Sequence, residues 1–206
     1  MSEFGYIPEA PEQSAFNNKG IFSPSDIYNL DQVDKWTQLG QLELIETKTA
    51  SSVTSLDFTS IKENEYMVHL LMAHGLNKSS SDKVCMRFYE SGVLETASVY
   101  QYGVEEIKSD NTGQQVRSDS ITYLQLEIAG TAEDTAGYNY LYNLGDNTSF
   151  SYQTTQYIND DAPRIKFYFG GGSLPQNSTV DGFQLFTESS TAFNGVFSLY
   201  GIKYTL

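Results

Sequence analysis

The sequence predicts an all-β protein: an antiparallel, jelly-roll-like β-sandwich with an extended N-terminal arm and one short helix. After Gly40, apolar and polar residues alternate in short runs that are separated by Ser, Thr, Asn, Asp and Gly. Such alternation is typical of strands joined by tight turns. Before Gly40 the alternation is missing, and three of the five prolines lie there. We therefore predict two parts, an N-terminal arm with a short helix over residues 1–39 and a β-sandwich body over residues 40–206.

The N-terminal part begins with extended or irregular chain and continues into the helix. Residues 1–18 carry turn-forming Gly and Pro and no periodic pattern. Ser23 is a favourable N-cap, and Pro24 suits the first position of a helix. The residues spaced to share one helix face are Ile27, Leu30 and Val33. Trp36 follows directly, and we expect it to pin the helix to the body.

About ten short strands follow, each recognised by alternation. They are expected over residues 41–47, 53–59, 65–73, 84–89, 121–128, 138–144, 149–157, 164–169, 182–186 and 195–204. The run 65–73 is apolar on both faces, which indicates a central strand. Residues 105–120 are polar and contain an Asn-Thr-Gly turn signal, so we predict a long exposed loop. No second helical pattern competes with a sandwich or barrel.

Composition excludes several classes of function. The net charge of −14 and the pI of about 4.3 argue against nucleic acid and anionic membranes, both of which attract basic proteins. The first thirty residues lack the basic start and apolar stretch of a secretory signal. No run approaches the roughly 20 apolar residues of a membrane-spanning helix. The single cysteine, Cys85, excludes an internal disulfide and is expected to be a small buried side chain.

The search for catalytic and metal-binding motifs gives little. His69 and His74 have opposite strand parity and would point to opposite faces, so a zinc site is not expected. No Gly-x-Ser-x-Gly nucleophile elbow is present. The run Gly170-Gly-Gly172 lacks the Lys-Ser/Thr of a phosphate loop, and we expect it to end the strand at Phe169 in a tight turn. We predict no enzyme activity, no metal site and no cofactor.

Two acidic segments could offer oxygen ligands to calcium. They are Asp146-Asn147 and Asn159-Asp-Asp161. Neither contains a full set of ligands, so solvated turns are the better interpretation.

Several phrases of the chain together resemble virion structural proteins of tailed bacteriophages, especially those that infect marine cyanobacteria. In the body these phrases are Gln41-Leu-Glu-Leu-Ile-Glu-Thr47, Phe88-Tyr-Glu-Ser-Gly-Val-Leu-Glu95, Tyr140-Leu-Tyr-Asn-Leu-Gly145, Phe169-Gly-Gly-Gly-Ser-Leu-Pro175 and Phe197-Ser-Leu-Tyr-Gly-Ile202. In the N-terminal part, Gly20-Ile-Phe-Ser-Pro-Ser-Asp-Ile-Tyr28 resembles the corresponding segment of the same proteins. The similarity runs through most of the chain and carries over no catalytic residue. It implies a structural component of the virion, either a capsid decoration or a tail or fibre subunit.

An acidic β body with an extended arm suits a subunit of a large assembly. We expect the arm to lie along a neighbouring virion protein and to order on binding. Its candidate partner-binding residues are Phe4, Tyr6, Ile7, Phe16 and Phe22. We expect other virion proteins and further copies of this chain as partners. The alternative is a receptor-recognition module that binds a host-surface glycan, and an enzyme such as a polysaccharide depolymerase comes third.

Overall fold

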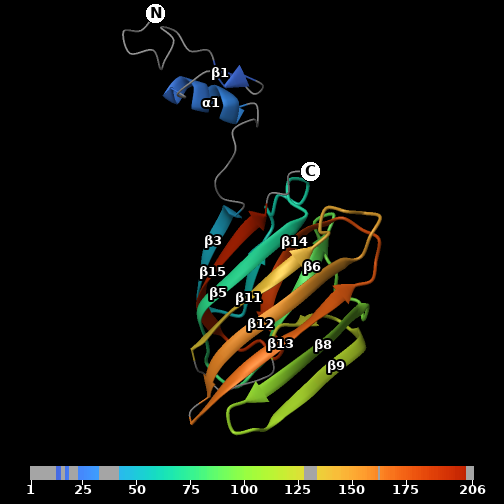
Figure 1. The fold of residues 1–206 in the computed structure, drawn as a ribbon. Coiled ribbons are helices and arrows are strands. Elements are labelled where there is room, and N and C mark those ends of the chain that lie inside the picture. Colours follow the sequence, from blue (N-terminus) through green and yellow to red (C-terminus); the bar gives the residue numbers. More distant parts are fainter. Residues whose placement is uncertain are drawn as a thin grey trace, which may run out of the picture. The chain divides into compact units, whose positions relative to one another are not determined.

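The computed structural model describes residues 13–14, 17–18, 23–32, 42–127, 134–161 and 163–202. Contacts divide the chain into two compact units, Met1–Gln41 and Leu42–Leu206. The second unit, which we call the body, contains two antiparallel sheets, and the described residues form a single helix, which lies in the first unit (Figure 1). The predicted all-β fold with one short helix is confirmed.

The helix begins where the sequence predicts. Helix α1 spans Pro24–Gln32, and the Ser23 hydroxyl accepts a hydrogen bond from the Asp26 backbone N–H at 3.2 Å. In return the Asp26 carboxylate accepts from the Ser23 N–H at 2.8 Å and from its hydroxyl at 2.6 Å, which forms a capping box. These hydrogen bonds from Ser23 lower the pKa of Asp26. Also in the first unit, β1 (Gln13–Ser14) pairs with β2 (Asn17–Asn18), while Val33 and Trp36 lie outside the described residues.

The body consists of a larger and a smaller sheet. In spatial order the larger sheet contains β3 (Leu42–Val53), β15 (Phe193–Ile202), β5 (Val68–Lys78), β11 (Thr135–Tyr142), β12 (Ser151–Asp161), β13 (Arg164–Leu174), β8 (Tyr100–Lys108) and β9 (Gly113–Ile121). The smaller sheet contains β10 (Leu124–Gln125), β6 (Val84–Glu90), β14 (Val180–Thr187) and β4 (Ser55–Phe58), with β7 (Val93–Leu94) paired to β6. In Figure 1, β11, β12, β13, β8 and β9 lie side by side in one layer, with β6 and β14 behind them.

The order of pairing is that of a jelly roll. Strands from the start of the body pair with strands from its end in nested order: β3 with β15, β4 with β14, β5 with β11 and β6 with β10. These pairs alternate between the two sheets, as in a long hairpin rolled into a sandwich. The hairpins β8–β9 and β12–β13 are additions, and β13 pairs with β8 to widen the larger sheet. The predicted jelly-roll-like sandwich is therefore confirmed.

The core lies between the two sheets and is rich in aromatic side chains. Phe58 and Phe183 stack with ring centroids 4.9 Å apart, and the fully buried Cys85 side chain belongs to the same core cluster. The run that the sequence marks as central is β5, which lies between β15 and β11. A jelly-roll core of this kind leaves the outer face of each sheet available for other contacts.

The predicted loop over residues 105–120 is wrong. This segment belongs to β8, β9 and the short turn between them, in which the Asp110 carboxylate accepts from the N–H and hydroxyl of Thr112 at 3.1 and 2.5 Å. Strand β9 lies at the sheet edge with β8 as its single partner. Both faces of such a strand can be polar, because backbone pairing alone holds it in the sheet. Its sequence then lacks the alternating apolar residues by which a strand is recognised.

The glycine run also differs from the prediction, because β13 continues through Gly170 and Gly172 to Leu174. A Cβ added at Gly172 would lie 2.5 Å from the Gln101 carbonyl oxygen and 2.6 Å from Leu124 Cδ2. The run therefore permits close approach of a neighbouring strand and of the smaller sheet, rather than a turn.

Of the two acidic segments, one is a turn and the other is a strand. Asp146 accepts hydrogen bonds from the N–H and hydroxyl of Thr148 at 2.8 and 2.6 Å, which lower the pKa of its carboxyl. Residues 159–161 instead end β12, so the predicted turn there is wrong. Asn159 is buried, and its amide donates to the Thr135 hydroxyl at 2.7 Å.

Candidate interaction surface

The predicted partner-binding residues Phe4, Tyr6, Ile7, Phe16 and Phe22 lie outside the described residues. The body nevertheless offers a surface that the sequence analysis did not recognise. It is the side of the larger sheet turned away from the smaller sheet, here called the outer face. Because directly paired residues of antiparallel strands project to the same side, the strand register determines which residues share it.

The register places apolar and aromatic residues of six neighbouring strands in continuous rows. One row crosses the sheet through Leu44, Tyr200, Leu70, Tyr140 and Thr154. The next row runs through Ser198, Met72, Tyr138, Gln156 and Phe169. At one end of the face, Ile158 pairs with Phe167, and Val196 pairs with His74. Neighbouring rows therefore form one surface over β3, β15, β5, β11, β12 and β13.

This face carries most of the exposed large apolar side chains of the described residues. Fourteen such residues are exposed, and the strand register places ten of them on the outer face. These ten are Leu42, Leu44, Met72, Ile107, Tyr152, Ile158, Ile165, Phe167, Phe169 and Val196. Scattered apolar residues are normal on a protein surface, whereas a contiguous set marks a site of interaction.

Charge is almost absent from the same surface. Among the described residues of the six strands β3 to β13, Asp160 is the one Asp, Glu, Lys or Arg that the alternation of exposed and buried side chains places on the outer face. On the next strand, β8, Glu105 pairs with Phe169 and shares the outer face with Ile107. The charged residues of β3 lie on the inner face of the sheet. Glu43, Glu46 and Lys48 pair with Gly201, Leu199 and Phe197, which face the core. In a chain with a net charge of −14, a face six strands wide with a single charged residue is a distinct feature of the molecule.

Tyrosines form the centre of the outer face. Tyr138, Tyr140 and Tyr142 follow one another along β11, with ring centroids 5.6 and 6.3 Å apart. The Tyr138 hydroxyl donates to the Gln156 side-chain oxygen at 2.6 Å, so the row also offers polar groups. Tyrosine combines a large rigid contact area with a hydrogen-bonding hydroxyl, which suits protein and ligand surfaces alike.

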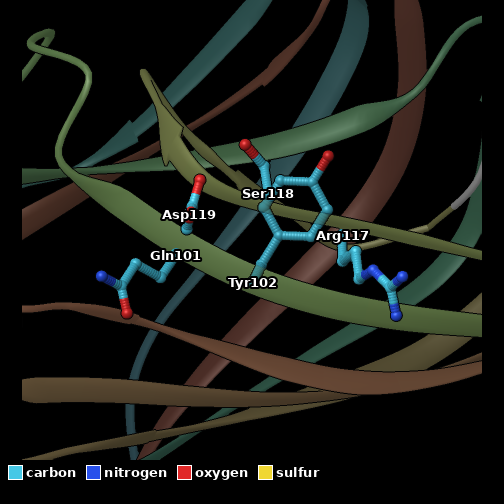
Figure 2. A pocket seen from close by; sticks show the side chains of 5 residues that line it. All are labelled: Gln101, Tyr102, Arg117, Ser118 and Asp119. Atoms are coloured by element: carbon cyan, nitrogen blue, oxygen red, sulfur yellow. The ribbon is translucent and has the colours of Figure 1, made fainter.

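The hollows on or beside this sheet include two of more than 400 Å³. The first, of about 410 Å³, is at the end of the outer face and is lined by His74, Gly75, Asp134, Thr135, Ala136, Ile158, Asn159, Asp160 and Ile165. The second, of about 540 Å³, lies at the β8–β9 edge and is lined by Gln101, Tyr102, Arg117, Ser118 and Asp119. Figure 2 shows the Tyr102 ring beside Ser118, with Asp119 and Arg117 on either side. These five lining residues include no His or Cys.

A polar network is buried on the inner face of the larger sheet. Lys78 and Glu127 are both fully buried and form an ion pair, and the Lys78 ammonium also donates to the Asp82 carbonyl oxygen at 2.8 Å. Burial raises the pKa of the Glu127 carboxyl, and the neighbouring Lys78 opposes this rise. Thr155 donates to the Leu126 carbonyl at 2.9 Å. The network fixes the chain after β10 to the larger sheet, and it is enclosed rather than open to a ligand.

The histidines and the cysteine lie where the sequence analysis expected them. His69 is buried, with its Nε2 2.8 Å from the Ile61 carbonyl oxygen, while His74 is exposed on the outer face. The two rings therefore lie on opposite faces of β5, as the strand parity predicted. Burial raises the pKa of the Cys85 thiol. Within the described residues, no three His, Cys, Asp or Glu side chains form a cluster that could hold a metal ion.

Comparisons with known proteins give no match to this chain, neither with a family model nor with a curated protein or a solved structure. Among the described residues, no helix is long and apolar enough to cross a membrane.

Proposed function

We propose that this protein is a structural, non-catalytic component of a tailed-bacteriophage virion, attached through its N-terminal arm. The observation that carries the proposal is the largely apolar outer face of the larger sheet, which carries few charges. Such a face is costly to leave in water, and it has the composition of a protein–protein interface core, in which charged residues are depleted and aromatic residues and Met are enriched. In a subunit that is surrounded by other proteins, neighbouring chains can cover such a face.

Two further observations support the virion as the assembly. Phrases of the sequence resemble phage structural proteins over most of the chain, and the body is a jelly roll, a fold that recurs in viral capsids. Fold alone does not define a function. The resemblance is therefore the argument for a phage virion as the assembly. The outer face is the argument that the protein assembles with other chains.

A receptor-recognition module that binds a host glycan is the second candidate. The row Tyr138, Tyr140 and Tyr142 favours it, because exposed tyrosine rings can stack against sugar rings while hydroxyl and amide groups such as that of Gln156 form hydrogen bonds. The aliphatic residues that flank the row favour protein instead. Met72, Ile158 and Val196 offer a sugar neither a stacking ring nor a hydrogen bond.

The proposal is tested by the copy number of the chain on purified, intact virions, measured by quantitative mass spectrometry. We expect the protein to remain with the particles through density-gradient purification. Hundreds of copies would place it on the capsid, and about six to eighteen would place it in the tail, as expected for symmetric assemblies. Particles that lack the protein would contradict the proposal. Binding of the isolated body to host polysaccharide would then favour the glycan-binding candidate.

A further inference from the structure

The outer face of the larger sheet is wide enough to be an interface by itself. Six strands about 4.8 Å apart span about 24 Å, and the six residue steps from Tyr142 to Ala136 span about 20 Å. The flat area is then about 500 Å², and protruding side chains increase the accessible area. A specific interface buries at least about 1,000 Å² in total, or about 500 Å² on each partner, so the face reaches this lower limit.

The charge pattern restricts what can cover this face. Two copies of a chain with a net charge of −14 repel each other over most of their surfaces. A contact between copies is therefore favourable only where carboxylates are absent, because a buried and unpaired carboxylate is costly. The rows through Leu44 and Met72 meet this condition from β3 to β13. The carboxylates of the outer face lie at its margins: Asp160 is one row beyond Ile158, and Glu105 of β8 follows Phe169 at the end of the second row.

The chemistry of the side chains favours protein over carbohydrate as the occupant. Seven of the ten exposed apolar residues on the outer face are aliphatic: Leu42, Leu44, Met72, Ile107, Ile158, Ile165 and Val196. They surround the tyrosine row on both sides, as apolar residues do in obligate homo-oligomer interfaces. A second sheet of the same kind can pack on such a face at the usual distance of about 10 Å between sheets.

We infer that the outer face of the larger sheet is buried against a second copy of this chain, so that the body is an oligomer held together by its tyrosine and aliphatic rows. A two-fold arrangement would bring the same patch of each copy together, as in most homodimers. Because apolar contact holds the copies together while like charge opposes it, association should strengthen as salt screens the repulsion. An interface built from ion pairs would show the opposite dependence on salt.

The test is the molar mass of the full-length protein in solution, measured by light scattering after size-exclusion chromatography. The wild-type protein should have at least twice the 23.0 kDa mass of one chain. The variants Met72→Glu and Phe167→Glu each place a carboxylate on the outer face and should weaken association at least tenfold. The control is Val93→Glu, which changes a more exposed apolar residue, 70% exposed on β7 of the smaller sheet, and should leave association unchanged.

A wild-type protein that has a mass of 23.0 kDa at its highest soluble concentration would overturn the inference. Oligomers that survive both face variants would overturn it as well. If both variants failed to fold, the wild-type mass and its salt dependence would decide. A monomer that binds neutral oligosaccharides, and loses this binding with Met72→Glu, would assign the face to a glycan instead. All of these measurements use the isolated protein, so their outcome is independent of the copy number on virions.

Discussion

Lys78 and Glu127 show how individual residues hold the two halves of the body together. Lys78 lies at the end of β5, and Glu127 lies shortly after β10, 49 positions later in the chain. Both side chains are fully buried. Removing such charges from water costs several kcal/mol for each ion, which their attraction and hydrogen bonds must offset. The loss of one partner alone is therefore expected to lower the free energy of unfolding more than the loss of both.

We predict that Lys78→Met lowers the free energy of unfolding by about 3–5 kcal/mol, because it removes the ion-pair partner of the buried Glu127 carboxylate. The double variant Lys78→Met, Glu127→Leu should recover most of this loss, since it removes both charges of the pair. Urea denaturation at constant m-value measures both. Lys62→Met is the control: its ion pairs with Glu43 and Glu65 are solvent-exposed, so little change is expected.

The same variant should show a pH dependence with a defined sign. Burial raises the folded-state pKa of Glu127 above its ordinary value, so its protonated form favours folding at low pH, and this contribution is lost as pH rises through the folded pKa. Without Lys78 the pKa rises further. The deficit of Lys78→Met should therefore be largest near neutral pH and should shrink toward the ordinary carboxyl range. A deficit that is constant with pH would contradict this account.

At the scale of elements, β5 contains an irregularity that neighbouring strands accommodate. Gly75 has φ of +60°, and the registers of β5 with β11 and with β15 both shift beside it. This is the geometry of a β-bulge, in which one strand carries an extra residue. The bulge keeps Leu76 and Lys78 on the inner face after His74 on the outer face.

We predict that Gly75→Ala lowers the free energy of unfolding by about 1–2 kcal/mol, because an L-residue is disfavoured at positive φ. The space around Gly75 is open, so the cost comes from the backbone and not from a clash. Gly103→Ala is the matched control, since this strand position is equally open and has no positive φ. It should stay close to the wild type or become slightly more stable. Equal losses in the two variants would contradict the explanation.

The helix and the strands also show which parts of the fold can be predicted from the sequence. The start of α1 was predictable because Ser23 and Pro24 act locally. Strand β5 was predictable because its long apolar run is typical of a strand in the middle of a sheet, where it lies between β15 and β11. Strand β9 was not, because an edge strand needs no apolar residue. In β13, the alternating apolar residues Ile165, Phe167 and Phe169 are exposed, while Lys166 and Tyr168 face inward. Alternation shows that a strand has two faces, but it does not show which one is buried.

For the whole molecule, the outer face could not be predicted from the sequence because it exists only once the strands are ordered. Met72 and Phe169 are 97 positions apart in the chain and belong to one row through Tyr138 and Gln156. The nested pairing of the jelly roll brings them together, and the inserted hairpin β12–β13 extends the surface. The partner-binding residues of the arm, in contrast, were predicted from a local feature. This feature is the density of large apolar side chains in a segment without apolar–polar alternation.

The last prediction follows from that density and from the separation of the two units. Residues 4–22 carry five large apolar side chains without the patterning needed to bury them, so a partner surface is the natural place for them. The body has its own core, and contacts divide the chain after Gln41. Deletion of residues 2–18 should therefore leave the thermal unfolding transition of the body largely intact and prevent its incorporation into virions. Calorimetry of the isolated protein and mass spectrometry of particles from complemented infections measure the two effects. Normal incorporation of the shortened protein would assign attachment to the body, and failure to fold would make the deleted residues part of the core.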